Sequence, residues 1–414
     1  MVTDPYTFHT LDNGLRIVIE VMPDVPSAAA GFLVRTGARD ETAELAGVSH
    51  FLEHMMFKGT ANRTWRQINI EFDALGSMYN AFTSHDRTFY FGWVRKGDVA
   101  KQMALLADMM RSALPPSEFD VEKKVILEEI AMSKDRIESV AVDFLMEKVF
   151  PDHSLAWPIL GYEKTVGDLK RDHMWEYFQR RYAPDNMVLI VAGNVDPARI
   201  IGVARQQCGD WKPAGDAASR GAPVFDGGDH GLVTDRFQQQ MVALAFPAAA
   251  GSSEICETAG AAAAILGGEN SRFFWNIIQA GLSPRAGAFH HDWEDTGLMI
   301  LWGVCEPKNA EALLDAIRKE ANRICSEAVD EREVARVKNK RRTALAVEGE
   351  APYYRLTQIM DDVDYRGAPR TVEQRLAEVD AISPKTLRDY FERYSINGEG
   401  HLISVGPRDR PAAE

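Results

Sequence analysis

The sequence predicts an α+β fold made of two homologous two-layer halves, each with a mixed, mostly antiparallel sheet and helices on one face. Two observations support this prediction. In the first part of the chain, strand-like runs alternate with segments whose apolar residues have helical spacing. In addition, a segment of that part recurs near the carboxyl terminus. The predicted elements of the first part are strands at 15–21, 28–34 and 89–94 and helices at 99–113 and 125–134.

The recurring segment has a constant spacing. Tyr177 and Gly193, which belong to an aromatic stretch and the strand after it, correspond to Tyr390 and Gly406; 390 − 177 and 406 − 193 both equal 213. The same spacing carries the strand predicted at 28–34 onto another apolar run, which begins at Met241. We therefore predict an internal duplication.

The predicted domains follow from this duplication and from composition. A chain of 414 residues is longer than a single core usually supports. Residues 208–231 are rich in Gly, Ala, Pro and Asp and lack apolar periodicity, which is typical of a linker. We expect a catalytic half at 1–207, the linker at 208–231 and a second half without metal at 232–414.

The chemically informative segment is HFLEH at residues 50–54. In a helix, His50 and His54 lie one turn apart on one side, so they can direct two imidazoles at one metal ion. Glu53 falls on the same side, where a carboxylate that does not bind the metal can accept a proton from water. Paired histidines also occur on helices that bind no metal. Together, however, the three residues indicate zinc-dependent peptidase chemistry.

A catalytic zinc ion usually has three protein ligands and one open position. Glu129 is the best candidate for the third ligand, in a segment whose apolar residues at 121, 125, 126 and 130 have helical spacing. Glu122 lies two turns earlier on the same face, where it can hydrogen-bond a ligating imidazole. A helix rich in Lys and Glu is most often a solvated surface, so only the combination with the histidines points to Glu129.

Taken together, these segments resemble the pitrilysin, insulysin and mitochondrial-processing-peptidase family of inverzincins. The resemblance covers nearly the whole chain, through HFLEHMMFKGT at 50–60, NAFTS at 80–84, the Glu residues at 122–129, PDNM at 184–187, AGN at 192–194 and ILGG at 265–268. It implies that His50, His54 and Glu129 bind one Zn²⁺ per chain and that Glu53 is the catalytic base.

The resemblance also implies a binding mode for the substrate. Residues 80–83 are expected to form an edge strand near the metal, to which an extended peptide adds through main-chain hydrogen bonds. Asn80, Ala81 and Thr83 are the predicted substrate-binding residues. The alternative is that Asn80 only caps a turn and that the neighbouring aromatic residues fill a core.

One departure from the family predicts a partner. Relatives that work alone or as homodimers carry an Arg and then a Tyr after a glycine-rich loop, and this pair holds the substrate carbonyl. Here Ile278 stands near the Arg position and Pro284 or Arg285 near the Tyr, and the duplication carries no zinc ligand into the second half. We therefore expect the catalytic subunit of a heterodimer, cleaving peptides in a closed chamber with a homologous subunit that lacks the zinc motif.

Alternatives stay open at this point. Arg272 or Arg285 can substitute for the missing pair, which would allow an active homodimer. The chain can also be a non-catalytic structural or peptide-binding subunit of a larger complex, although the intact zinc motif argues against that. Residues 290–292 (HHD) with Glu294 and Asp295 are assigned to structure or solvent, because adjacent histidines on a strand point to opposite faces and cannot readily share one ion. His153 is assigned in the same way, because it is a lone residue in a loop.

Composition excludes some partners and suggests a location. The net charge of −14 argues against nucleic acid or an anionic membrane. The four cysteines lack the spacing of a disulfide framework or a zinc knot. No segment has the length and apolarity of a membrane span, and no signal peptide is evident, although a removed one stays open. We expect a cytoplasmic protein.

Overall fold

The computed structural model describes residues 5–215 and 220–408. Within them the chain forms two compact units, and each is described by itself. The first unit contains Met1–Ile130, Trp157–Arg220 and Ala346–Thr371, and the second contains Ala131–Ala156, Gly221–Leu345 and Val372–Glu414. None of the helices in the described residues combines the length and apolarity needed to cross a bilayer.

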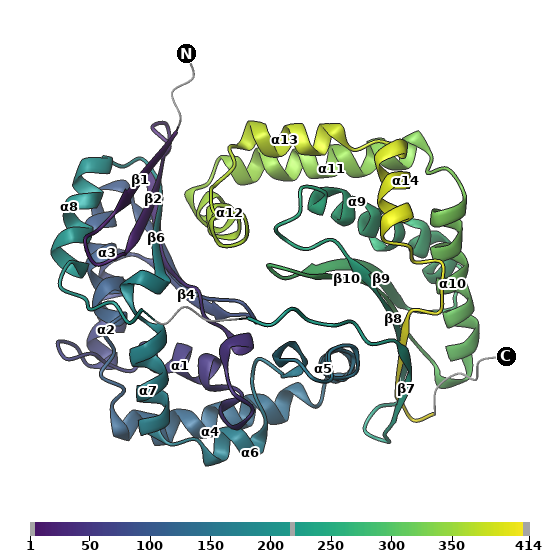
Figure 1. Ribbon diagram of the computed structural model, residues 1–414, viewed down its shortest axis with the longest axis horizontal. Helices are drawn as coiled ribbons and strands as arrows, with labels where there is room; N and C mark the ends of the chain where they lie inside the picture. Colours follow the sequence, from purple (N-terminus) through teal and green to yellow (C-terminus); the bar gives the residue numbers. More distant parts are fainter. Residues whose placement is uncertain (1–4, 216–219, 409–414) are drawn as a thin grey trace. The chain divides into compact units, whose positions relative to one another are not determined.

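The first unit is built on a six-stranded sheet with the order β1-β2-β6-β3-β5-β4 (Figure 1). Its strands are β1 (Tyr6–Thr10), β2 (Arg16–Val21), β3 (Ser27–Val34), β4 (Met78–Thr83), β5 (Thr88–Arg95) and β6 (Met187–Gly193). Neighbouring strands run antiparallel except β2 and β6, which are parallel. β4 therefore lies at one edge of the sheet.

The second unit repeats this topology in a five-stranded sheet with the order β7-β11-β8-β10-β9. Its strands are β7 (Gly228–Val233), β8 (Gln240–Ala248), β9 (Arg285–Asp292), β10 (Gly297–Cys305) and β11 (His401–Gly406). The single parallel pair, β7 with β11, corresponds to β2 with β6. The shared order and orientation confirm the predicted α+β fold with two homologous halves.

The predicted linker, 208–231, is only partly irregular. Residues 216–219 lie outside the described residues, and β7 begins at Gly228, inside the predicted stretch. The division into 1–207, 208–231 and 232–414 therefore stays a prediction about the duplicated halves rather than a description of the compact units.

The helices of the first unit are α1 (Val48–Met56), α2 (Trp65–Leu75), α3 (Val99–Met109), α4 (Pro116–Ser133), α6 (Glu163–Asp168), α7 (Arg171–Arg181), α8 (Pro197–Cys208) and α12 (Pro352–Tyr365). One face of the sheet packs against α1 and α3 in a large apolar core. Phe51, Leu52 and Met55 of α1 join Phe32 of β3 and Leu106 of α3 in this core, and all five are almost fully buried. This packing fixes α1 beside β4.

The opposite face of the same sheet is covered by α12, which the sequence did not predict. Leu356, Ile359 and Val363 of α12 form a separate core with sheet residues such as Leu33 and Phe89. The prediction of helices on one face was therefore wrong for this sheet. The physical reason is that the central strands are apolar on both faces, and both faces need a cover.

The second unit has its own helices: α5 (Ile137–Val149), α9 (Cys256–Gly267), α10 (Ala310–Ser326), α11 (Glu331–Gly349), α13 (Val372–Ala381) and α14 (Pro384–Arg393). Buried residues of α9, α10 and α14 form one core with β8 and β10. α5 contacts β8 and β11, and its buried residues are outside that core. In chain order, α12 of the first unit lies between α11 and α13, and α5 of the second unit lies between α4 and α6.

Candidate metal centre

The amino terminus of α1 is held by the buried side chain of Glu41. Glu41 accepts hydrogen bonds of 2.7 Å from the backbone amides of Gly47 and Ser49, which an α-helix cannot satisfy by itself. Gly47 precedes the helix with φ +96°, and a Cβ there would lie 2.7 Å from the carbonyl oxygen of Leu160. These contacts fix the start of the helix that presents His50. The sequence analysis missed Glu41, because a loop separates it from the helix it caps.

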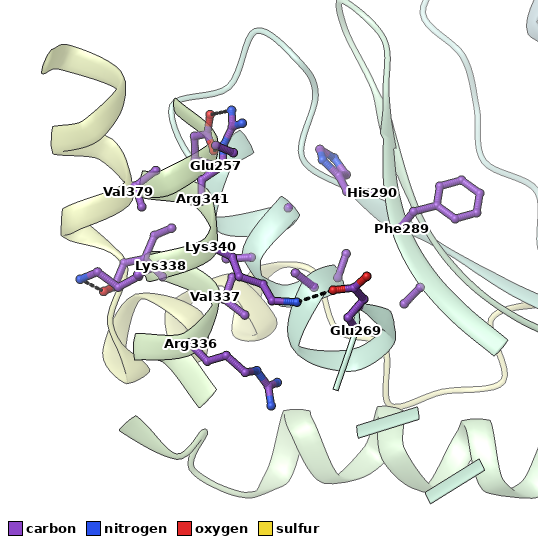
Figure 2. A pocket seen from close by; sticks show the side chains of 18 of the residues that line it. Glu257, Glu269, Phe289, His290, Arg336, Val337, Lys338, Lys340, Arg341 and Val379 are labelled. Carbon is purple, nitrogen blue, oxygen red and sulfur yellow. Dashed lines mark hydrogen bonds and ion pairs between the residues drawn. The ribbon is translucent and has the colours of Figure 1, made fainter. Parts of the chain in front are cut away.

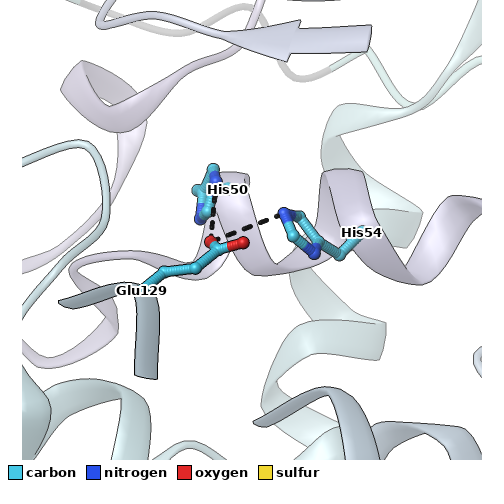
Figure 3. Close-up of side chains that lie close together, drawn as sticks. All are labelled: His50, His54 and Glu129. Carbon is cyan, nitrogen blue, oxygen red and sulfur yellow. Dashed lines mark ion pairs between the residues drawn. The ribbon is translucent and has the colours of Figure 1, made fainter. Parts of the chain in front are cut away.

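The structure brings the side chains of His50, His54 and Glu129 close together (Figure 3). Oε2 of Glu129, on α4, lies 3.8 Å from Nε2 of His50 and 3.8 Å from Nε2 of His54. The two imidazole rings have their centroids 4.8 Å apart. The three side chains therefore converge on one point from two helices.

This arrangement fits a zinc ion. Two ligands at bond lengths of about 2.1 Å in a tetrahedral site lie about 3.4 Å apart, so the observed 3.8 Å needs a closure of only a few tenths of an ångström. Nδ1 of His50 is a buried atom without a hydrogen-bond partner in the described residues. The donor set of two imidazoles and one carboxylate leaves a fourth position open, as in catalytic zinc sites.

Glu122 fixes the orientation of His54. Its Oε1 lies 2.8 Å from Nδ1 of His54, and its Oε2 lies 2.6 Å from Nζ of Lys58. Burial by itself raises the pKa of Glu122, but the contacts with His54 and Lys58 outweigh burial and the pKa is lowered. Glu122 is therefore ionised and accepts the Nδ1 proton, which leaves the lone pair of His54 on Nε2, toward Glu129.

The electrostatics of His50 favour its neutral form. Burial, with a smaller contribution from the neighbouring His54, lowers the pKa of His50 to about 4. A neutral imidazole is the form that binds metal.

Glu53 stands beside the ligand set and is held by a different contact. The hydroxyl of Thr83 donates a 2.6 Å hydrogen bond to Oε2 of Glu53. Burial raises the pKa of Glu53, and the nearby Glu129 acts in the same direction. A carboxylate with a raised pKa is a stronger proton acceptor when it is ionised.

The predicted substrate-binding residues lie on β4, which pairs with β5 and has no strand on its outer side among the described residues. Asn80 is exposed, and its Oδ1 accepts a 2.9 Å hydrogen bond from the amide of Ala81. Ala81 is buried against the core that contains α1. Thr83 points toward Glu53, as its hydrogen bond shows. The strand therefore offers an open backbone edge beside the metal centre.

The equivalent position in the second unit cannot hold a metal in this way. The spacing of 213 residues places His54 at Gly267, where a Cβ would lie 1.7 Å from the amide nitrogen of Ala288. It places Glu53 at Leu266, which is fully buried, and Glu129 at Arg342, which donates to Asp380 at 2.7 Å. The close approach of α9 to β9 occupies the space that the imidazole fills in the first unit.

The two arginines that were considered as substitutes for the missing pair already have carboxylate partners. Arg272 makes two hydrogen bonds to Glu333, of 2.9 and 2.8 Å, and its side chain is 9% exposed. Arg285 forms an ion pair with Glu138. The side chain of Ile278 has no hydrogen-bond donor. Each arginine is therefore already paired with a carboxylate, and Nη1 of Arg272 is a buried donor that has no hydrogen-bond partner among the described residues.

Comparison with known proteins agrees with this geometry. Residues 16–163 match the family model "Insulinase (Peptidase family M16)", and residues 168–341 match "Peptidase M16 inactive domain". A Bacillus subtilis protein named "Uncharacterized zinc protease YmxG" is 30% identical over 91% of this chain and 92% of that protein. The mitochondrial-processing peptidase subunit beta of Blastocladiella emersonii is 29% identical over 96% of this chain and 88% of that subunit.

Solved structures share the fold. A protease from Helicobacter pylori has a TM-score of 0.90 at 18% identity, over 97% of this chain and 99% of that chain. A protein from Pseudomonas fluorescens described as a peptidase M16 inactive domain also has a TM-score of 0.90, at 14% identity over 99% and 100% of the two chains. With two family models matched in order along the sequence and the fold shared throughout, the chain belongs to the insulinase family of peptidases, family M16.

Proposed function

We propose that the protein is a zinc metalloendopeptidase that cleaves extended peptides, with one catalytic Zn²⁺ per chain bound by His50, His54 and Glu129. The observation that carries this proposal is the convergence of these three side chains with Glu53 beside them, hydrogen-bonded to Thr83 and outside the ligand set. A non-catalytic subunit would have no need of this arrangement. Relatives named as zinc proteases support the same conclusion.

In this proposal each residue has a separate task. Zinc, when bound, supplies Lewis-acid polarisation of a water molecule or of the scissile carbonyl. Glu53 accepts the proton of the attacking water and delivers it to the leaving nitrogen. The free edge of β4, with Asn80, Ala81 and Thr83, binds the peptide backbone in an extended form. Glu122 keeps the ligating nitrogen of His54 available.

The test is cleavage of an internally quenched peptide together with metal analysis. Glu53→Gln is expected to retain zinc and lower cleavage by about a hundredfold or more, because the amide cannot accept the proton. His54→Ala is expected to lose the zinc. Glu128→Gln is the matched control, because Glu128 is an exposed neighbour of Glu129 on the same helix. Unchanged turnover in Glu53→Gln, or full zinc content in His54→Ala, would contradict the assignment.

We further propose that this chain is the catalytic subunit of a heterodimer, in which a homologous partner without the zinc motif supplies donors to the substrate carbonyl within a closed chamber. Support comes from Ile278, whose side chain has no hydrogen-bond donor, and from the carboxylate partners of Arg272 and Arg285. Donors aimed at a developing oxyanion contribute about 3–4 kcal/mol each, so their absence lowers the rate by orders of magnitude. The mitochondrial-processing peptidase relative is itself named as a beta subunit.

Mixing experiments test the partner. The purified chain alone is expected to bind zinc and cleave poorly, and activity should rise with the concentration of a homologous subunit that carries the Arg and Tyr. Full activity from a highly purified, homogeneous preparation of this chain would instead support an active homodimer. The cytoplasmic location expected from the sequence stays a prediction.

A further inference from the structure

We propose that Cys256, His290 and Asp292 form a second transition-metal site, of the kind that binds Zn²⁺, in the second unit. Cys256 is the first residue of α9, and the other two residues lie near the end of β9. One ligand atom from each of the three lies within 4.8 Å of the other two, the same limit that His50, His54 and Glu129 satisfy. From the sequence, His290 and Asp292 were assigned to structure or solvent, because adjacent strand histidines point to opposite faces, and nothing in the sequence linked them to Cys256.

The fold explains why these side chains meet. Alternate residues of a strand point to the same face, so His290 and Asp292 share a side of β9 with Ala286 and Ala288. Ala286 and Ala288 pack against the core that includes α9. The backbone of Ala288 touches Gly267 at the carboxyl end of α9, and the strand then runs back along the helix toward its first residue. The site thus stands on two rigid elements in direct contact.

The tautomer of His290 is set by a backbone carbonyl. Nε2 of His290 lies 2.6 Å from the carbonyl oxygen of Ala249, so Nε2 carries the proton and the lone pair is on Nδ1. A hydrogen bond from the other ring nitrogen to a carbonyl or carboxylate is the usual support of a metal-ligating histidine. The same bond argues against a Cys-His-Asp nucleophile, because the histidine of such a triad needs both ring nitrogens for its partners.

The donor set selects the class of metal. Thiolate and imidazole favour Zn²⁺, Co²⁺ and similar ions, whereas Ca²⁺ and Mg²⁺ prefer oxygen ligands. Three protein ligands leave a fourth coordination position open. Cys256 and His290 line a cavity of about 600 Å³ between α9, β9 and α11, which offers a route for an ion or an exogenous ligand (Figure 2). In that view His290 and Phe289 leave β9 on opposite sides.

The second site is not a copy of the first. The spacing of 213 residues places Val48, the first residue of α1, at Ala261, because 48 + 213 = 261, whereas α9 already begins at Cys256. The thiol therefore lies in additional helix that α1 lacks. It stands at the opposite end of α9 from Gly267, the position equivalent to His54. The two sites can thus be removed independently.

Cobalt binding tests the proposal with a signal that the first site cannot give. A thiolate bound to Co²⁺ shows a charge-transfer absorption in the near ultraviolet, and His50, His54 and Glu129 include no sulfur. Metal-free protein carrying His50→Ala and His54→Ala is titrated with Co²⁺. We expect this absorption to saturate at one ion per chain and to disappear when Zn²⁺ is added in excess.

Variants in the same background locate the ion. Cys256→Ser is expected to abolish the absorption, and Asp292→Asn to weaken Co²⁺ binding at least tenfold. Cys325→Ser is the matched control, since Cys325 is the other cysteine that is not fully buried, and it should leave the absorption unchanged. Circular dichroism checks that each variant is folded. No absorption at saturating Co²⁺, or an absorption that survives in Cys256→Ser, would overturn the proposal.

A second measurement uses the unaltered chain. Zn²⁺ should slow alkylation of Cys256 by iodoacetamide, measured by peptide mass spectrometry, and should leave alkylation of Cys325 unchanged. Equal rates for Cys256 with and without Zn²⁺ would count against the site. None of these readouts depends on peptide cleavage, so the second site and the proposed peptidase activity can fail separately.

Discussion

The hydroxyl of Thr83 and the carboxylate of Glu53 are joined by a 2.6 Å hydrogen bond that links the edge strand β4 to the metal-binding helix α1. The same strand that offers its free backbone edge therefore also orients Glu53, the proposed general base. A peptide that adds to β4 would lie next to a carboxylate whose rotamer is already fixed. In the proposed mechanism, the side chain of Thr83 would couple peptide binding to proton transfer.

Thr83→Val tests this coupling. A hydrogen bond to a charged group contributes about 1.5–3 kcal/mol, so its loss should lower kcat roughly tenfold or more with little change in KM. Thr83→Ser keeps the hydroxyl and should retain most of the activity. Steady-state kinetics on a quenched peptide gives both constants. A raised KM with unchanged kcat would show that Thr83 acts on the substrate and not on Glu53.

Glu122→Gln tests the support of His54. The amide is a weaker acceptor for the Nδ1 proton and leaves Lys58 without its partner, so zinc affinity should fall about tenfold to a hundredfold. Competition with a fluorescent chelator measures the affinity. Glu128→Gln, on the exposed side of the same helix, should bind zinc as the unaltered chain does. Equal affinities for the two variants would remove Glu122 from the site.

Glu41 predicts a pH dependence of stability. Burial raises the pKa of Glu41 from 4.5 to about 8. Between these values the folded chain keeps a proton that the unfolded chain has released, so the free energy of unfolding should fall as pH rises, by up to about 1.4 kcal/mol per pH unit. Glu41→Gln should flatten this slope, and the exposed Glu44→Gln should leave it unchanged. Urea unfolding at several pH values checks both.

Arg355→Ala tests how α12 is held on the first sheet. The guanidinium of Arg355 is buried and bonds Glu20 of β2 at 2.8 Å, so its removal leaves a buried carboxylate without a partner. The free energy of unfolding should fall by about 3–5 kcal/mol. Arg95→Ala removes an exposed pair with Asp98 and should cost less than about 1 kcal/mol. Similar losses in both variants would show that burial of the Glu20 pair is unimportant.

Local patterns were enough to predict the part of the site that lies on one helix. His50, Glu53 and His54 are within five residues, and helical geometry alone places them on one side. Glu129 lies on a second helix and was proposed because a catalytic zinc ion needs a third ligand and because the family resemblance implies it. Glu122 followed from Glu129, because seven residues make about two helical turns. Glu41 was missed, because no periodicity connects a loop carboxylate to the helix that follows it.

The boundaries of elements were predicted less well, for physical reasons that the structure shows. The helix expected at 99–113 ends at Met109, because Ser112 forms an antiparallel bridge with Thr60 and the amide of Ala113 donates to the carbonyl oxygen of Gly59. The helix expected from residue 125 begins at Pro116, because its buried face runs through Phe119, Glu122 and Ile126. Val121, which was counted as apolar face, is 57% exposed.

The position of α12 has a consequence for the order of events during synthesis. The segment of the first unit that covers the second face of its sheet ends near Tyr365, long after the last strand of that sheet, β6, is complete at Gly193. A ribosome-bound chain therefore carries an apolar surface formed by residues such as Leu33, Phe89 and Ile190 until most of the protein has been made. The duplicated halves are therefore not independent folding units. Removing the second half would remove α12 from the first sheet, and removing the first half would remove α5 from the second sheet.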